Sequence, residues 1–191
     1  TSDFSKGNGS SKNPYQIKTL EELRKIVAHN NSHFILMNDI DAAYESVQNM
    51  FTKDVPFNGT LDGNGKTIKN LLNTTSMFNA LGENAVITNL KFSKANMVAS
   101  ADSGIIAHTN NGLIEKCTIS NVAITGMRGG YGVFVTFNYG TIKNCKSDGK
   151  LAYSRSDWSG LYNGGIVAVN QATGKVMNCS SSVDISVGSR D

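Results

Sequence analysis

The stretch Gly140-Thr141-Ile142-Lys143-Asn144-Cys145 decides the fold, because the chain repeats its pattern. Close copies begin at Gly112 and Gly174, and looser copies begin at Lys66 and Ala85. Apolar residues that recur at fixed places, every few tens of residues, predict a stack of similar units that bury their faces against one another. All three cysteines share the last position of the pattern, which reads Leu71, Leu90, Cys117, Cys145 and Cys179.

The spacing and composition of the copies favour strands over helices. The central apolar residues, Ile68, Ile87, Ile114, Ile142 and Val176, are 19, 27, 28 and 34 residues apart. An α-solenoid holds its period more tightly, whereas these units vary in length and are rich in β-branched residues, Gly and Asn. We therefore expect an all-β parallel β-solenoid of roughly five or six coils.

Within the pattern, the alternation of side chains breaks at one position. Residues two apart share a face of a strand, so Ile142 and Cys145 cannot both point inward along a straight strand. Asn144 lies between them, and Asn tolerates bent and left-handed backbone. We expect a corner here, with one strand ending at the Ile and the next beginning inward at the Cys. The other copies have at this position Asn70, Asn89, Lys116 and Asn178.

A second pattern supplies another side of each coil. It aligns Gly104-Ile105-Ile106-Ala107 with Gly132-Val133-Phe134-Val135 and Gly165-Ile166-Val167-Ala168, and Ser76-Met77-Phe78-Asn79 is a degenerate first copy. Runs that are apolar throughout are typical of strands covered on both faces. The outer face is then covered by loops or by a partner. Polar turns lead from these runs into the cysteine pattern through Asn110, Asn138 and Asn170.

Composition is that of one packed domain. Hydrophobic residues make up 39% of 191 residues and charged residues 17%, which argues against disorder. The net charge of +3 is small and scattered, so we expect no nucleic-acid partner. No apolar run approaches the roughly 20 residues that span a bilayer, so we expect no membrane insertion.

The N-terminal part predicts a cap. Residues 1–13 are expected to be a flexible lead-in, 14–60 a cap, and 61–191 the coils, truncated at the C-terminus as part of a longer polypeptide. Short strands are predicted at Tyr15–Ile17 and His33–Met37. Between them, Thr19-Leu20-Glu21-Glu22 forms a capping box that begins an amphipathic helix. Such a helix would cover the unpaired strand edges and the exposed core at the end of the solenoid.

The cysteines predict packing rather than chemistry. Stacked thiols would lie about 4.8 Å apart, whereas a disulfide needs Cβ atoms about 3.8 Å apart that converge. No C-x-x-C pair and no His at matching spacing accompanies them, so we expect neither a metal nor a cofactor. The preferred interpretation is a ladder of small buried side chains.

The sequence resembles bacterial surface proteins that carry GLUG repeats. The opening from Gly7 to Ile17, the strand ending at Asp41 and the run from Phe57 to Ile68 resemble the start of those proteins. The later Gly-Ile-Val-Ala and Gly-x-Ile-x-Asn-Cys patterns resemble the repeat itself, so the resemblance covers residues 7–180. The fourth residue of the repeat core departs from the usual Gly, and is Asn79, Ala107, Val135 or Ala168 here.

This resemblance implies a right-handed parallel β-helix with an N-terminal capping helix, exported to the surface of a bacterial cell or secreted. Such helices occur in adhesin-like proteins and in the N-terminal regions of immunoglobulin A metalloproteases. Peptidase chemistry would need an H-E-x-x-H motif, which His29, His33 and His108 do not form. We therefore expect a non-catalytic scaffold or stalk whose partners are a host protein or glycan and the rest of a larger parent polypeptide.

A long insertion before Gly165 is the candidate binding region. Aromatic and Arg side chains on loops carry binding energy at protein interfaces and stack on sugars. The alternative is that these rings cover the apolar outer face. The candidate binding residues in this insertion are Tyr153, Arg155, Trp158 and Tyr162, and a neighbouring insertion, expected on an adjacent coil, contributes Arg128 and Tyr131.

An enzyme is the rival hypothesis, either a polysaccharide lyase or a hydrolase. It would need a base or a pair of carboxylates on neighbouring coils. Asp148 and Asp157, near Arg128 and Arg155, are the acids that can be assembled, and no repeat position stacks acids. His108 is expected to be structural rather than a base. A carbohydrate-binding module is the other alternative.

Overall fold

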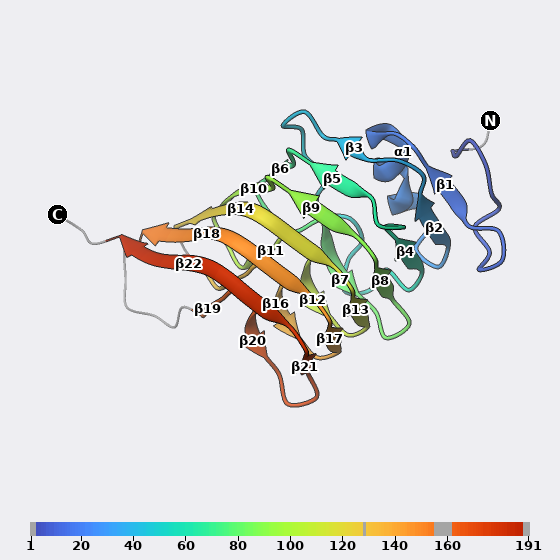
Figure 1. The fold of residues 1–191 in the computed structure, drawn as a ribbon. Coiled ribbons are helices and arrows are strands. Elements are labelled where there is room, and N and C mark those ends of the chain that lie inside the picture. Colours follow the sequence, from blue (N-terminus) through green and yellow to red (C-terminus); the bar gives the residue numbers. More distant parts are fainter. Residues whose placement is uncertain (1–2, 128, 155–161, 189–191) are drawn as a thin grey trace.

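The computed structural model describes residues 3–127, 129–154 and 162–188. The chain winds into an all-β parallel solenoid of about five turns, with one short helix near the N-terminus (Figure 1). Every pairing between strands is parallel, and each strand pairs with its counterparts in neighbouring coils. The predicted fold class is therefore confirmed.

Four sheets run along the solenoid. The seven-stranded sheet contains β1 (Tyr15–Ile17), β2 (His33–Leu36), β4 (Thr60–Asp62), β8 (Val86–Thr88), β13 (Leu113–Glu115), β17 (Thr141–Lys143) and β21 (Lys175–Met177). The eight-stranded sheet contains β3 (Ile40–Asp41), β5 (Thr67–Lys69), β9 (Lys91–Ser93), β14 (Thr118–Gly126), β18 (Lys146–Ser154) and β22 (Ser180–Gly188). Its other two strands are β10 (Asn96–Ala99), which pairs with β14, and β6 (Leu72–Asn73), which pairs with β10. The four-stranded sheet contains β7 (Phe78–Leu81), β12 (Ala107–Asn110), β16 (Val135–Asn138) and β20 (Val167–Asn170). The three-stranded sheet contains β11 (Ser103–Gly104), β15 (Tyr131–Gly132) and β19 (Asn163–Gly164).

The corner in the cysteine pattern is confirmed. Asn144 has φ 56°, in the left-handed region, between the inward side chains of Ile142 and Cys145. Asn89, Lys116 and Asn178 share this conformation, with φ of 52°, 53° and 52°. The seven-stranded sheet thus ends at this corner in each coil, and the eight-stranded sheet begins just after it.

The copy that begins at Lys66 is out of phase with the others, which corrects one prediction. Ile68 pairs with Ile40 and Phe92 in the eight-stranded sheet, whereas the neighbour of Ile87 is Leu61. Asn70 is left-handed, with φ 53°, but forms the next corner of its coil. The short first interval of 19 residues reflects this change of phase rather than a short coil.

The second pattern is a corner rather than a strand covered on both faces. The chain bends at Ile105–Ile106 and at Val133–Phe134, so both residues of each pair are buried although they are adjacent. The third copy also slips by one residue, because Gly132 pairs with Gly164 and not with Gly165. No outer apolar face needs covering at these described corners, which corrects that expectation.

The solenoid interior is one continuous apolar core. Its first coils are filled by aromatic rings, with the ring centroids of Phe57 and Phe78 5.2 Å apart and those of Phe51 and Phe57 5.4 Å apart. Later coils use branched aliphatic residues such as Ile114 and Ile142, which are fully buried. Phe92, Tyr131 and Phe134 add fully buried rings to these later coils, so aromatic and aliphatic side chains together fill the cross-section.

The cap consists of α1 (Leu20–Lys25) and the 3-10 helix η1 (Ile26–Ala28). Thr19 Oγ1 accepts a hydrogen bond from the backbone N–H of Glu22 at 3.1 Å, as the capping box predicts. The Glu22 carboxylate accepts instead from the N–H groups of Lys18 and Ser5. Because the chain tightens into η1 after Lys25, Val27 faces outward and is exposed rather than on the buried face.

Part of the expected lead-in packs against the cap. The ring of Phe4 is buried and stacks on Tyr15, with 4.5 Å between centroids. The backbone N–H of Gln16 in β1 donates to the carbonyl of Lys6. These contacts cover the first strand of the seven-stranded sheet, while the boundaries between lead-in, cap and coils stay a prediction.

Candidate functional site

Tyr131 is a core residue, which corrects its assignment to a binding surface. Its side chain is fully buried, and its hydroxyl donates to the carbonyl of Ala99 at 3.4 Å. The ring fills the space above Gly126, where an added Cβ would come within 2.1 Å of a ring carbon. Burial follows from the position of Tyr131 in β15, beside the corner that turns the chain inward.

The other predicted binding residues are placed only in part. Tyr153 is half-buried against the core, and Tyr162 is 57% exposed just before β19. Arg128, Arg155 and Trp158 lie outside the described residues. Among described members of the set, Tyr162 is therefore the ring available to a partner.

The acids and the histidine of the enzyme hypothesis have structural partners. Asp148 accepts a hydrogen bond from the N–H of Asn121 at 2.7 Å, beside the irregularity between β14 and β18. Asp157 lies outside the described residues. His108 packs edge-on against Phe137, with its Nδ1 3.0 Å from Thr109 Oγ1, and burial lowers its pKa. The described contacts give His108 and Asp148 roles in packing and turn formation.

The cysteines stack in adjacent coils. Register places Leu90, Cys117, Cys145 and Cys179 at one position of the four successive coils. Leu71 is not in this stack, because it precedes β6 and lies one corner further along its coil. Each thiol lies close to the carbonyl two residues before it, at 3.2 Å for Cys117 and 3.3 Å for Cys145.

The chemistry of this stack is that of free thiols. All three cysteines are unpaired, and the described residues hold no cluster of His, Cys, Asp and Glu suited to a metal. A hydrogen bond with Cys145 and burial raise the pKa of Cys117, and burial raises the pKa of Cys179, whereas the hydrogen bond with Cys117 lowers the pKa of Cys145. The raised pKa of Cys117 and Cys179 makes them poor nucleophiles, and Cys145 is fully buried, which fits a packing role for the stack.

An asparagine ladder runs beside the four-stranded sheet. Asn110 Nδ2 donates to Asn138 Oδ1 at 2.8 Å, and Asn138 Nδ2 donates to Asn170 Oδ1 at 2.8 Å. Asn110 and Asn138 are fully buried. The sequence places these three residues in matching polar turns, but gives no indication that their amides bond to one another. The ladder joins successive coils through side chains as well as backbone.

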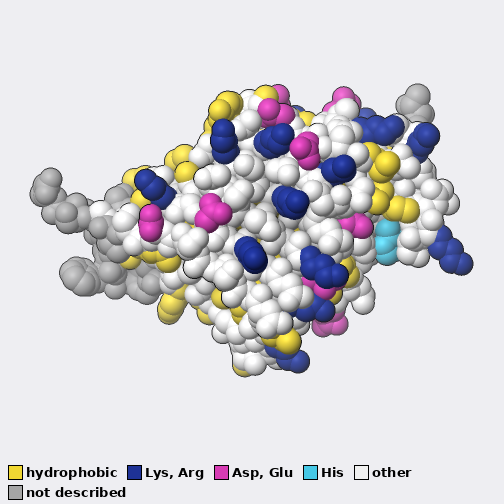
Figure 2. Space-filling model, viewed as in Figure 1, with side chains coloured by type: hydrophobic (Ala, Val, Ile, Leu, Met, Phe, Trp, Pro, Cys, Tyr) yellow, Lys and Arg dark blue, Asp and Glu magenta, His cyan; other side chains and the backbone are white. Residues whose placement is uncertain are grey.

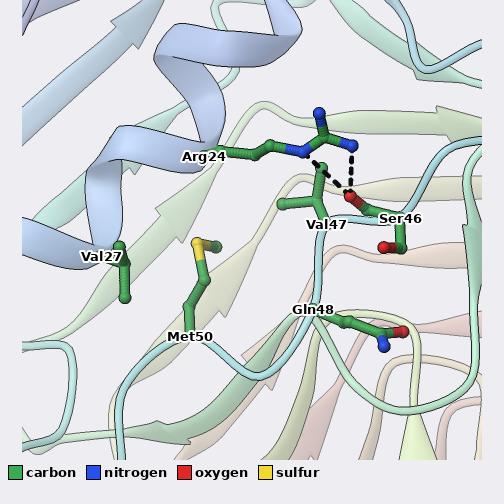
Figure 3. Close-up of a pocket in the computed structure, with 6 residues that line it drawn as sticks. All are labelled: Arg24, Val27, Ser46, Val47, Gln48 and Met50. Carbon is green, nitrogen blue, oxygen red and sulfur yellow. Dashed lines mark hydrogen bonds between the residues drawn. The ribbon is translucent and has the colours of Figure 1, made fainter.

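A pocket lies where the cap meets the first coil (Figure 3). It has a volume of about 250 Å³ and is lined by Arg24, Val27, Ser46, Val47, Gln48 and Met50. Arg24 donates from Nε and Nη2 to the carbonyl of Ser46, at 3.1 and 2.8 Å, and from Nη2 to Glu45 at 2.8 Å. The guanidinium therefore fastens the loop before Met50 to α1.

A second hollow is polar and lies at the loops after β7. Its volume is about 420 Å³, and it is lined by Pro56, Asn58, Gly82, Glu83, Asn84 and Asn111. Asn58 Oδ1 accepts from the N–H of Asn84, and Asn111 donates to the carbonyl of Leu81. Amide side chains here stabilise turns, and Glu83 is the one ionisable lining residue.

The lateral face carries interspersed charges (Figure 2). Lys91 and Lys146 occupy one outward column of the eight-stranded sheet, with Thr118 between them. Lys143 pairs with Glu115 at 3.2 Å, and Lys69 pairs with Asp39 at 3.3 Å. This mixture of signs favours solubility and does not form a groove for a polyanion.

The two ends of the solenoid differ (Figure 1). At the N-terminal end, Met50 and Phe57 form bridges to β7, and α1 covers the core beside them. At the other end, β20, β21 and β22 are the last strands of their sheets. Val176 is 38% exposed, whereas its counterpart Ile142 in the previous coil is fully buried. In the sequence, this coil corresponds to the last copies of the two patterns, which begin at Gly165 and Gly174.

These features define the class of protein: a β-solenoid with a helical cap near its N-terminus, held together by stacked side chains. No helix in the described part of the chain is long and apolar enough to cross a membrane. No family model matches the chain.

The chain is similar to two known proteins. Halomucin of Haloquadratum walsbyi is 34% identical over 142 residues, which cover 63% of this chain and 2% of halomucin. The chain therefore spans a very small part of that relative. A crystal structure of a presumed immunoglobulin A1 protease from Bacteroides ovatus has a TM-score of 0.62 at 20% identity, and the match covers 99% of this chain and 83% of that one. The second likeness shows a shared fold.

Proposed function

We propose that the chain is a non-catalytic β-solenoid module of a secreted or surface-anchored protein, in which it acts as a rigid spacer. The observation that carries this proposal is the stacking register, which continues from β4 to β21 through the same inward column. Each coil adds about 4.8 Å of length, so the number of coils sets the reach of the module.

The comparisons support an extracellular setting. Halomucin is by its name a mucin, and this chain matches a small segment of it. The chain covers most of the Bacteroides ovatus structure, which is named as a protease, but Asp148 and His108 here serve turns and packing. We therefore assign any peptidase activity to other parts of an immunoglobulin A protease-like or adhesin-like parent.

Antibody labelling of the producing cells tests the location. Antibodies raised against the purified chain should bind intact cells, or the protein should be found in the culture medium. A cytoplasmic marker protein serves as the control for leakage. Signal that appears only after lysis would contradict the proposal. Incubation of the purified chain with immunoglobulin A should leave the antibody intact, and cleavage would contradict a non-catalytic module.

Carbohydrate binding is the second candidate function. The exposed ring of Tyr162 favours it, because aromatic faces stack on sugars. A glycan array probed with the purified chain tests it, with Trp158→Ala and Tyr162→Ala as variants. Binding that both variants weaken would support a glycan site at this insertion. If the chain bound no glycan, the carbohydrate-binding candidate would be ruled out and the spacer role would remain.

A further inference from the structure

Five segments of the chain have the Asn-x-Ser/Thr pattern of an N-glycosylation acceptor. The pattern allows any residue except Pro at its middle position, and all five segments meet this condition. Because the pattern is short and the chain is rich in Asn, Ser and Thr, the pattern alone does not select a site. The structure decides which amides a transferase can reach. The five segments begin at Asn8, Asn30, Asn58, Asn73 and Asn178.

Two of these amides are engaged in the folded chain. Asn73 is fully buried, its Nδ2 donates to the carbonyl of Val47 at 2.7 Å, and its Oδ1 accepts from the N–H of the same residue at 3.0 Å. Asn58 lines the polar hollow after β7, where its Oδ1 accepts from the N–H of Asn84 and lies close to Gly82. Modification of either Asn would require part of the fold to open.

Two further segments do not bring the amide and the hydroxyl together. In the described part of the chain, no hydrogen bond joins the side chains of Asn30 and Ser32, or those of Asn178 and Ser180. Asn178 is a left-handed corner with φ 52°, and Ser180 begins the strand β22. These two segments therefore match the pattern in sequence only.

The segment at Asn8 combines exposure with the required contact. Asn8 is exposed on the turn before β1, and its Oδ1 accepts from the backbone N–H of Ser10 at 3.1 Å and from the Ser10 hydroxyl at 2.7 Å. Its Nδ2 has no hydrogen-bond partner among the described residues. The nitrogen that would receive a sugar is thus free, and the hydroxyl that the pattern requires lies on the amide oxygen of the same side chain.

The contact with the hydroxyl favours the chemistry of transfer. An amide nitrogen is a weak nucleophile because its lone pair is delocalised onto the oxygen. A hydrogen bond to Oδ1 polarises the amide, so Nδ2 loses a proton more easily as it attacks. The turn is also held in place, since the N–H of Asn8 donates to the carbonyl of Asn13 at 3.0 Å and the N–H of His33 donates to the carbonyl of Gly9 at 2.9 Å.

We propose that Asn8 is the acceptor of an N-linked glycan, an inference that rests on the proposed function because this modification occurs on exported proteins. The donor is an oligosaccharide carried on a polyprenyl diphosphate. Asn8 Nδ2 forms a bond to the anomeric carbon of the first sugar, and the bond from that carbon to the diphosphate oxygen breaks. The polyprenyl diphosphate leaves with the electron pair, and one Nδ2 proton passes to solvent. No oxidation or reduction takes place.

Transfer to the folded 191-residue chain tests the proposal. The chain, incubated with an oligosaccharyltransferase and a polyprenyl diphosphate oligosaccharide, should gain the mass of one glycan, which peptide mapping should place on Asn8. Asn8→Gln and Ser10→Ala should lose this glycan, and Ser10→Thr, which restores a hydroxyl, should keep it. Asn13→Gln is the matched control, because it changes an exposed amide of the same turn outside the pattern, and it should be modified like the wild type.

A synthetic peptide of residues 5–13 shows that the transferase is active. A folded chain that stays bare at Asn8 while this peptide is modified would overturn the proposal. Transfer first to another of the five segments, or to Ser10→Ala at the rate of the wild type, would overturn it as well. Circular dichroism should show the same strand content in every variant, so that a lost glycan reports the acceptor and not the fold.

The native protein separates this inference from the proposed function. Peptide mapping of the chain recovered outside the producing cells should find the glycan on Asn8. A bare Asn8 in that extracellular chain would overturn the inference and leave the proposed location standing. A chain confined to the cytoplasm would contradict the proposed location, whereas transfer to its folded form in the purified assay would still support Asn8 as the acceptor.

Discussion

At the residue scale, Cys145 shows how the stack uses a thiol as a small apolar side chain. It is fully buried between Cys117 and Cys179 in adjacent coils. Cys145→Asp should destabilise the fold by on the order of 3 to 5 kcal/mol, because it buries an unpaired charge. Cys145→Ala and Cys145→Val should each cost less than about 1.5 kcal/mol. Urea denaturation measures both.

Cys179→Asp provides a control with the same chemistry in the last described coil. Its side chain is only partly buried, so solvent reaches the new carboxylate. We expect a much smaller loss of unfolding free energy than for Cys145→Asp. Equal losses at the two positions would contradict the difference in burial between Cys145 and Cys179.

Thiol labelling gives a second residue-scale prediction. In the native protein Cys179 should react first, while the buried Cys117 and Cys145 should react only as fast as the protein opens. Burial raises the pKa of Cys179, so its labelling rate should keep rising as the pH passes about 8.5, the usual value for a free thiol. Mass spectrometry after timed alkylation resolves the sites. Fast labelling of all three native thiols would refute the stack.

At the element scale, the corners depend on residues that accept a left-handed backbone. Asn144→Val should destabilise by about 1 to 2 kcal/mol, because a β-branched residue is strained at φ 56°. Asn144→Gly should be close to neutral. Thermal unfolding measures the change, and Thr141→Val, in the strand β17, is the matched control and should be tolerated. If Asn144→Val were as stable as the wild type, the left-handed backbone conformation assigned to Asn144 would be contradicted.

The cap contributes a separate element-scale prediction. Thr19→Ala removes the oxygen that accepts from the N–H of Glu22, and should cost about 1 kcal/mol of stability. Thr125→Ala, exposed on β14, removes a hydroxyl that caps no helix and should change stability little. Denaturant midpoints compare the two variants. Similar midpoints would mean that α1 is not coupled to the folding of the coils.

Local backbone requirements explain which elements the sequence predicts. A left-handed corner selects Asn directly, so Asn89, Asn144 and Asn178 could be found from their spacing. The spacing could not show that Ile68 lies in the eight-stranded sheet, or that the copy at Gly165 is shifted by one residue. Stacking against neighbouring coils sets this register, and no local sequence signal reports it. Tyr131 illustrates the same limit for the site, since an aromatic residue beside a loop is as suited to the core as to a partner.

At the scale of the whole molecule, the solenoid has a direction. Phe4, α1 and a loop cover the core at one end, while β20 to β22 are the last described strands of their sheets at the other. Backbone bonds, the cysteine stack and the asparagine ladder all join neighbouring coils along this axis. Such a rod keeps its two ends at a fixed distance, which is the property that a spacer requires.

The rise along the outward column of Thr67, Lys91, Thr118, Lys146 and Ser180 tests this account most directly. Thr67 and Ser180 lie four strand spacings apart, so electron spin resonance between labels at these positions should give a narrow distribution near 19 Å, broadened by the label arms. Dilution with unlabelled protein removes any contribution from a second copy. A broad distribution, or one centred at more than twice this separation, would contradict the stacked coils.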